Sequence, residues 1–446
     1  MRLVLRTVTG CALCALLTAF HALAAQTSSA PKKRAPVDPA ARELNGFLTA
    51  AQEAIDRQDY ATAAQNYQNY LAKKPDDATV HYDLGYVYSA LKQPTNAKSE
   101  YEKAIALNPK MGAAYQNLGL TLLPTDPAAA IEPLQKAAEL LPADARTKWL
   151  LGVALEKTNK VPAAIEQYEA AEKLDDKDPK DPEIRLSLGR SLLISGHLNE
   201  AEAAFREALA LHPTGPALTE THLRLAEALV AQKRLDEGAA ELSSYLQTSP
   251  NDTSARITLA SILVDLGKED EALAQLDQAA AVTAEDLRAL KLRSQIYFEK
   301  KRYDDDVPVL LKAAALAPKD PDIFARLGRV YLLKKDYPNA VHWLAAAYNM
   351  DTTATDLLGE AIEAEYLNKN YSATLAGLDE LAHRKELPLG SLYMRATCYD
   401  HLGQAPEALD AYQKFLQLNK DENSDMYFVS TARVRVLARE LRNKKR

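Results

Sequence analysis

The sequence predicts an all-α fold that is built from a repeated pair of short helices. Glycine is scarce, with 16 residues in 446, while alanine and leucine are abundant and no β-branched runs alternate with turn signals. The clearest pair lies in residues 78–111. Apolar residues recur there at steps of three and four, first around Leu84 and then around Tyr101, as is typical of half-buried helices. Neither helix could bury its stripe alone, so the pair requires neighbours.

Residues 1–24 form a separate element, which we interpret as a secretory signal peptide. A positive start at Arg2 and Arg6 precedes a short apolar run from Cys11 to Leu23, and small residues then lead to a cleavage site near Ala24. The run is too short to span a bilayer. We expect a secreted or periplasmic bacterial protein. Because Cys11 stands at the start of the apolar run rather than after it, it fits a lipoprotein site poorly. A lipid-anchored accessory subunit of an outer-membrane, secretion or polysaccharide-export machine is the alternative.

Residues 25–43 are rich in Ser, Pro and Lys and show no periodicity, so we expect a flexible linker. The helical pattern then runs through residues 44–422. Residues 423–446 predict a C-terminal capping helix with a basic tail, because an array of repeats needs a helix to cover its last apolar face. One side of this helix carries Phe428, Val429, Ala432, Val436, Leu437 and Leu441.

Two features recur through residues 44–422 with a period close to 34. The first is a leucine followed by a small residue, at Leu84-Gly85, Leu118-Gly119, Leu151-Gly152, Leu188-Gly189, Leu225-Ala226, Leu259-Ala260 and Leu327-Gly328. The second is an alanine with a large residue four places later, beginning at Ala97, Ala164, Ala201, Ala272, Ala340 and Ala408. Small residues let two helices approach closely where they cross, and the larger ones fill the groove around them.

This pattern resembles the tetratricopeptide repeat family, whose repeat has small residues at its eighth and twentieth places and large ones around them. The resemblance implies a right-handed α-α superhelix, a solenoid of about eleven helix-turn-helix repeats. One unit fits poorly: residues 355–388 place Glu363 and Glu365 where apolar residues are expected, so we expect its frame to slip by one residue.

The sequence contains no pattern that predicts catalysis. Motifs for a nucleophile elbow, a phosphate-binding loop or a zinc protease are missing, and no histidine pairs with a cysteine at metal spacing. The acids Asp304, Asp305 and Asp306 are interpreted as ordinary exposed charges in the first turn of a helix. Cys398, the only cysteine outside the signal, is interpreted as a small half-buried residue. We therefore expect no enzyme activity, no cofactor and no metal. The mild net charge of −7, mixed in sign, also predicts no nucleic-acid partner.

Binding of a protein or peptide is the function that remains. In the family that the chain resembles, the second, fifth, ninth and twelfth places of each first helix line the concave groove. In this sequence those places give Tyr82, Tyr86, Gln116, Trp149 and Arg190, and further along Arg288, Lys291, Gln295, Arg329 and Tyr393. Tyr82 and Tyr86 stand where the family's clamp for a C-terminal carboxylate has lysine and asparagine. The aromatic group instead suggests a surface for an extended peptide or an amphipathic helix. Packing of the same aromatics against the next repeat is the open alternative.

Overall fold

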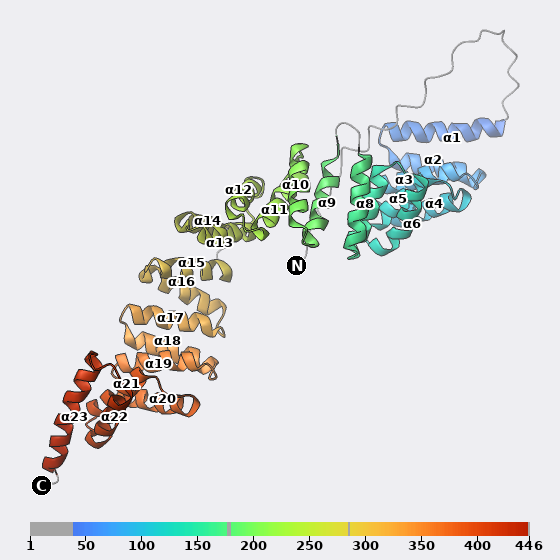
Figure 1. Cartoon of the computed structure of the whole chain (residues 1–446). Helices are drawn as coiled ribbons and strands as arrows, with labels where there is room; N and C mark the ends of the chain where they lie inside the picture. The colour runs from blue at the N-terminus through green and yellow to red at the C-terminus, as the bar shows by residue number, and fades with distance from the viewer. Residues whose placement is uncertain (1–38, 176–179, 284–285, 445–446) are drawn as a thin grey trace. The chain divides into compact units, whose positions relative to one another are not determined.

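The computed structural model describes residues 39–175, 180–283 and 286–444, and these contain 23 helices and no strand (Figure 1). The expected all-α repeat fold is confirmed. The predicted signal peptide lies outside the described residues, as does most of the predicted linker. The first helix begins at Pro39, earlier than the predicted start of the array at residue 44.

The chain divides into two compact units, which meet in sequence between Pro142 and Ala143. The described part of the first unit contains three helix pairs: α1 (Pro39–Asp56) with α2 (Tyr60–Lys73), α3 (Ala78–Ala90) with α4 (Pro94–Leu107), and α5 (Gly112–Leu122) with α6 (Pro127–Leu140). Within each pair the two helices lie side by side and run in opposite directions (Figure 1).

The second unit contains eight further pairs and a final helix among its described residues. The pairs are α7 (Ala145–Lys157) with α8 (Val161–Leu174), α9 (Pro182–Ile194) with α10 (Leu198–Ala210), α11 (Gly215–Ala231) with α12 (Leu235–Thr248), α13 (Thr253–Asp265) with α14 (Glu269–Val282), α15 (Leu287–Glu299) with α16 (Tyr303–Leu316), α17 (Pro321–Leu333) with α18 (Tyr337–Met350), α19 (Thr355–Leu367) with α20 (Tyr371–Arg384), and α21 (Leu389–His401) with α22 (Ala405–Leu418). The final helix, α23 (Asp425–Lys444), packs on α22. The number of pairs agrees with the eleven repeats that the sequence predicts.

The small residues of the repeat lie where the two helices of a pair cross. A Cβ atom placed on Gly152 would lie 2.5 Å from the ring of Tyr168, and one on Gly85 would lie 2.7 Å from the ring of Tyr101. Both rings are fully buried. The close approach explains the alternation of small and large residues, because a side chain at the glycine would displace the ring that fills the crossing.

The turn within each pair also repeats. In six successive pairs, from α11 to α22, one turn residue adopts a positive φ at the same place of every repeat: Lys233, Gly267, Lys301, Lys335, Lys369 and Gly403. Glycine takes this conformation without strain, whereas lysine adopts it at a steric cost. Helix starts are fixed as well. Asp77, Asp144 and Asp252, for example, each accept a hydrogen bond from a backbone N–H in the first turn of the following helix.

The poorly fitting unit, α19 with α20, does not slip its frame as the sequence led us to expect. Leu358, Ile362 and Ala364 form the buried face of α19, and Glu363 is exposed. Ile362 stands at the place that Gly328 occupies in the preceding repeat. The compensation comes from Gly377 on α20, where a Cβ atom would lie 2.6 Å from the Ile362 side chain. Leu378 keeps the large place of α20, one repeat after Leu344, and is fully buried, while Gly377 beside it makes room for Ile362, so the packing is kept.

The interpretation of residues 304–306 as exposed charges is wrong for one of them. Asp304 and Asp305 are exposed and form ion pairs with Lys334 and Arg302. Asp306 is fully buried, with 0% of its surface accessible. It stands one repeat after Ala272 and one repeat before Ala340, at the small place of the second helix, and therefore points into the crossing between α15 and α16.

Candidate protein-binding surface

The two compact units divide the predicted site residues between them. Tyr82 and Tyr86 lie on α3 and Gln116 on α5, all in the first unit, whereas Trp149 lies on α7 and Arg190 on α9, in the second. All five are partly buried. The two groups are described separately, each within its own unit.

In the first unit, Tyr82 joins neighbouring repeats. Its hydroxyl accepts a hydrogen bond from the Asn117 side chain on α5, with a distance of 3.1 Å between nitrogen and oxygen. Its ring lies 5.9 Å from that of Tyr101, between centroids, and packs against the cluster formed by Ala97, Tyr101 and Leu118. Tyr82 therefore has a packing role, as the alternative interpretation proposed, and only part of its surface remains accessible.

A carboxylate next to Tyr82 shows how far water is excluded from this part of α3. Burial raises the pKa of Asp83 to about 6, and the negative charge of Asp77 adds to the effect. The side chain is neutral in an increasing fraction of molecules as the pH falls through 6. Sequence reasoning did not single out Asp83, because it lies between the places that define the groove.

In the second unit, Trp149 and Arg190 belong to one connected surface. The indole Nε1 of Trp149 donates a hydrogen bond to the Ser187 hydroxyl on α9, at 3.0 Å. One turn along α9, Arg190 donates two hydrogen bonds to Glu156 on α7, of 2.8 and 3.1 Å, and one of 3.3 Å to Glu220 on α11. We call this group, Trp149, Glu156, Glu183, Arg190 and Glu220, the α7–α9–α11 surface.

Glu156 is the hub of the hydrogen bonds on this surface. Besides Arg190, the hydroxyls of Tyr168 and Ser191 donate to it, at 3.0 and 3.2 Å. Burial of the Arg190 guanidinium opposes its charge, but its hydrogen bonds to Glu156 and the charges of Glu156 and Glu220 outweigh this and raise its pKa. Arg190 is thus permanently charged and already paired, so it holds the surface in shape rather than offering a free cation.

Among the three carboxylates of this surface, Glu183 is the one whose negative charge is least neutralised by neighbouring cations. Burial raises its pKa, and the charges of Asp181 and Glu220 raise it further, while Arg190 opposes the shift. The α7–α9–α11 surface carries three carboxylates and one guanidinium. Arg224 forms ion pairs with both Glu220, at 3.6 Å, and Glu227, at 2.9 Å, so this neighbouring pair adds one charge of each sign and leaves the excess unchanged. The surface therefore combines an aromatic side chain with surplus negative charge.

The predictions from sequence missed Glu156, Glu183 and Glu220, although the rule that selected Trp149 and Arg190 includes them. Glu156 occupies the twelfth place of its first helix, and Glu183 and Glu220 the second place of theirs. The selection favoured aromatic and basic residues and passed over the acids at the same places.

The later groove candidates in the second unit are mostly engaged in ion pairs. Their partners are Asp286 for Arg288, Asp320 for Lys291 and Glu360 for Arg329. Tyr393 packs against the rings of Tyr412 and Phe415, with centroids 6.3 and 5.4 Å apart.

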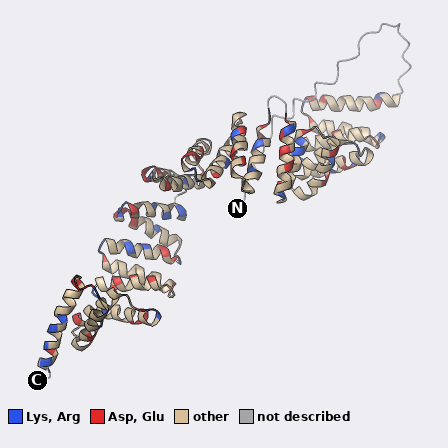
Figure 2. Cartoon of the chain, in the orientation of Figure 1, with Lys and Arg blue, Asp and Glu red and all other residues tan. Residues whose placement is uncertain are grey.

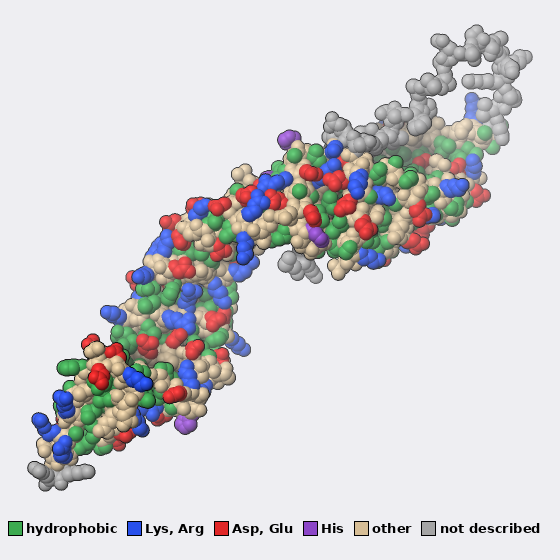
Figure 3. All heavy atoms as spheres, viewed as in Figure 1, with side chains coloured by type: hydrophobic (Ala, Val, Ile, Leu, Met, Phe, Trp, Pro, Cys, Tyr) green, Lys and Arg blue, Asp and Glu red, His purple; other side chains and the backbone are tan. Residues whose placement is uncertain are grey.

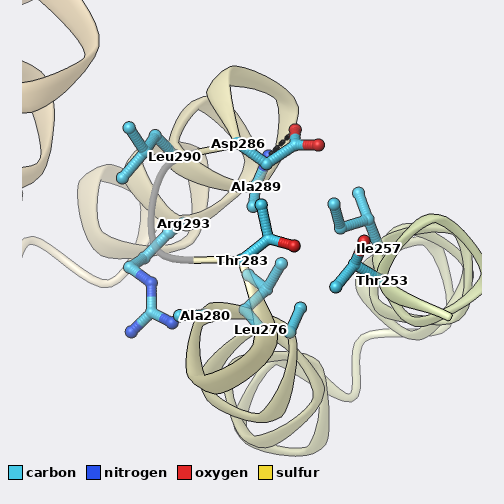
Figure 4. Close-up of a pocket in the computed structure, with 10 residues that line it drawn as sticks. Thr253, Ile257, Leu276, Ala280, Thr283, Asp286, Ala289, Leu290 and Arg293 are labelled. Carbon is cyan, nitrogen blue, oxygen red and sulfur yellow. Dashed lines mark hydrogen bonds between the residues drawn. The ribbon is translucent and has the colours of Figure 1, made fainter. Parts of the chain in front are cut away.

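A small pocket lies between three helices of the second unit. A pocket between α13, α14 and α15, lined by residues such as Ile257, Leu276 and Arg293, has a cavity of about 20 Å³ (Figure 4). That is close to the space that one water molecule requires. In the same described ranges, no group of three or more His, Cys, Asp or Glu side chains could hold a metal ion.

Two further findings bear on the predictions from sequence. Cys398 is fully buried and free, and burial raises the pKa of its thiol to about 11, so at neutral pH it is a packing residue rather than a nucleophile. None of the helices in the described part of the chain is both long and apolar enough to cross a membrane.

Comparison with known protein families identifies the type of repeat. Family models described as tetratricopeptide repeat match residues 48–112, 125–182, 157–216 and 186–253, residues 229–296, and residues 391–421, which together make up more than half of the chain. Among curated proteins, the chain is similar to tetratricopeptide repeat protein 37 of Xenopus laevis, with 26% identity over 153 residues. The match covers 32% of this chain but only 10% of that protein.

Solved structures show similar helical repeats. MamA is 23% identical, with a TM-score of 0.36, and the match covers 38% of this chain and 92% of MamA. The C-terminal part of a repeat protein from Cytophaga hutchinsonii is 18% identical, with a TM-score of 0.45 and coverage of 55% and 98%. PilF of Pseudomonas aeruginosa is 18% identical, with a TM-score of 0.35 and coverage of 48% and 97%. None of these similarities identifies a partner for this chain.

Proposed function

This chain belongs to the tetratricopeptide repeat family, and we propose that it is an exported, non-catalytic scaffold that holds a protein or peptide partner in the concave groove formed by its first helices. Proteins of this family bind protein partners, and the chain consists almost entirely of such repeats. The observation that carries the proposal is the α7–α9–α11 surface, where three successive first helices contribute side chains to one connected group.

The chemistry of this surface suggests what the partner supplies. Trp149 is partly exposed and has its indole N–H already satisfied, so an apolar side chain can cover its ring without leaving a buried donor unpaired. A basic side chain placed near Glu183 would lower the raised pKa of that carboxyl and gain a charge-assisted hydrogen bond. We infer a partner segment that combines apolar and basic residues.

A capture experiment with matched variants tests this proposal. The wild type, Trp149→Ala and the double variant Glu183→Gln/Glu220→Gln serve as bait for an envelope fraction of the native host, once equal helicity has been confirmed by circular dichroism. The control is Glu166→Gln/Glu169→Gln, which removes two exposed carboxylates from the second helix α8. A partner retained by the wild type and the control but lost by both surface variants supports the proposal. Identical capture by all four proteins would refute it for this surface.

Export is proposed from residues 1–24 alone. Intact mass of the protein from the host distinguishes the two routes that the sequence leaves open. A mature chain that begins near Ala25 indicates a cleaved signal peptide and a secreted or periplasmic scaffold. A lipid-modified N-terminus at Cys11 indicates the anchored accessory subunit, and an unprocessed chain with an intact residue 1 would contradict both.

A further inference from the structure

The final helix has one face that is firmly packed. Leu437 is buried against Ala408 and Tyr412 of α22, and Val434 and Leu441 pack on the same cluster. Arg433 extends this face with two hydrogen bonds to Asp400 of α21, of 2.7 and 2.6 Å. These contacts fix the rotation of α23 about its own axis.

The opposite face of α23 is apolar in its N-terminal half and exposed. Phe428 has 76% of its surface accessible, Val429 has 40% and Val436 has 42%, and Ala432 between them is also exposed. At 100° per residue these four side chains form one stripe, on the side of the helix away from Leu437. Figure 3 shows hydrophobic side chains at the surface of this end of the chain, next to basic ones.

The repeat frame shows what such a stripe does elsewhere in the chain. Val429 stands three whole repeats after Leu327, and Leu327, like Leu84 in the first unit, is buried. First helices such as α17 pack between two second helices, here α16 and α18, and so need two apolar faces. Among the described helices, α22 is the one against which α23 packs closely. The exposed stripe of α23 is therefore a second helix-packing face on which none of the described helices lies.

The C-terminal half of the exposed face is basic. Arg435, Arg439 and Arg442 follow one another at steps of four and three residues, so they form a row along one edge of the apolar stripe. Figure 2 shows basic residues spaced along α23. No carboxylate pairs with any of the three within the described residues, in contrast to Arg190, Arg329 and many other cations of the chain. On the other side of the stripe lies Glu440.

We propose that the exposed face of α23 binds an acidic amphipathic helix of a partner protein. Apolar residues of that helix cover Phe428, Val429 and Val436, and its carboxylates pair with the arginine row. From residue 428 to residue 442 the face is about 21 Å long, which corresponds to a helix of about 14 residues. The arginines lie along one edge of the stripe and Glu440 along the other, and this opposite sign of charge on the two sides fits an ordered polypeptide better than a uniformly anionic lipid surface. This surface is separate from the α7–α9–α11 surface.

The probe is a hydrocarbon-stapled, fluorescent peptide with the sequence of α14, EDEALAQLDQAAAV, which has the required length, acidic residues and apolar face. Its fluorescence anisotropy is followed as the full chain is added. We expect saturable binding that weakens about tenfold in Phe428→Ser/Val436→Ser, through lost apolar contact, and about tenfold in Arg435→Gln/Arg439→Gln/Arg442→Gln, through lost ion pairs. The replaced side chains are exposed, so both variants are expected to fold.

Matched controls separate the proposal from its competitors. Lys312→Gln/Lys319→Gln/Lys335→Gln makes the same charge change at exposed positions elsewhere and should bind like the wild type. A peptide with its acids replaced by amides should bind about tenfold more weakly. No binding of the acidic peptide, or equal binding by all variants, would overturn the proposal. So would attachment to phosphatidylglycerol vesicles in place of the peptide, or a dimer in light scattering that Phe428→Ser/Val436→Ser dissociates.

Discussion

Replacing Asp306 by alanine should stabilise the protein at neutral pH. Both carboxylate oxygens of Asp306 are buried without a hydrogen-bond partner among the described residues, and the hydroxyl of Ser294, on the facing helix, is unpartnered as well. The neighbouring repeats hold Ala272 and Ala340 at the same place, and both are fully buried. Alanine therefore fits this crossing, and the substitution removes a charge that the interior does not compensate.

The size of the expected stabilisation follows from the pKa of the Asp306 carboxyl. Burial raises the pKa of Asp306 from 3.8 to about 6, against smaller opposing effects of Ser294 and Arg326. The folded state then binds more protons than the unfolded state between these two values, so stability falls as the pH rises through this window. The difference between these two pKa values, at about 1.36 kcal/mol per pKa unit, lowers the free energy of unfolding by roughly 3 kcal/mol at pH 7.5. This cost declines to about 1 kcal/mol at pH 4.5. The small void left by alanine reduces the net gain to about 2 kcal/mol at pH 7.5.

Repeat arrays unfold in segments, so the measurement should be local. Hydrogen exchange of α15 and α16 peptides, read by mass spectrometry at pH 7.5 and 4.5, compares each variant with the wild type at the same pH. Asp306→Asn tests the charge at constant size, and Asp304→Ala, whose side chain is 93% exposed, should change stability by less than about 0.5 kcal/mol. A loss of protection in Asp306→Ala at pH 7.5, or an equal gain at both pH values, would refute the reasoning.

Three further outcomes are expected. Gly152→Leu should destabilise its helix pair by about 1–3 kcal/mol through overpacking. Gly359→Ala, where a Cβ atom meets nothing within 4 Å, should be neutral or stabilising. Urea denaturation followed by circular dichroism distinguishes the two variants. Arg190→Met should cost about 1–3 kcal/mol in the same assay, because Glu156 and its hydrogen bonds lose their cation, and an unchanged midpoint would contradict this. Cys398 should resist alkylation at pH 8 in the native chain and react once urea is added, as peptide mass spectrometry can show; rapid native labelling would contradict its burial.

The repeat frame made most of the fold predictable from sequence. Leucine followed by glycine or alanine in first helices, and alanine in second helices, recur at the repeat spacing in most of the pairs and located the crossings, because small residues permit that close approach. The frame failed where a repeat keeps the packing volume but changes its location. At Ile362 the small place of α19 holds a large residue, and Gly377 on α20 makes room for it, which a rule tied to one helix cannot detect. At Asp306 an acid occupies a place where other repeats have alanine. Because acids are common and usually exposed in the first turn of a helix, its burial was not predicted from the sequence.

The candidate site was less predictable, because its character depends on which side chains meet across repeats. The rule for groove places selected Trp149 and Arg190, but it did not give their hydrogen-bond partners, which come from neighbouring repeats: Ser187 on α9 and Glu156 on α7. Sequence spacing gives the face on which a side chain lies, not the rotamer that decides between a free cation and a bound one. The same limit applies to Tyr82, whose hydroxyl is held by Asn117.

Charge pairing between neighbouring repeats explains why the two proposed surfaces differ. Many ion pairs join one repeat to the next, such as Glu156 with Arg190, Asp304 with Lys334 and Asp320 with Lys291. These paired charges are not available to a ligand. A partner must then recognise the charges that the pairing between repeats does not neutralise. On the α7–α9–α11 surface the remainder is negative, because Glu156, Glu183, Glu220 and the neighbouring Glu227 outnumber Arg190 and Arg224. On α23, which has a neighbouring repeat on one side only among the described residues, the remainder is a row of arginines. The chain thus presents opposite charges at two places, and a partner chosen by one surface should be rejected by the other.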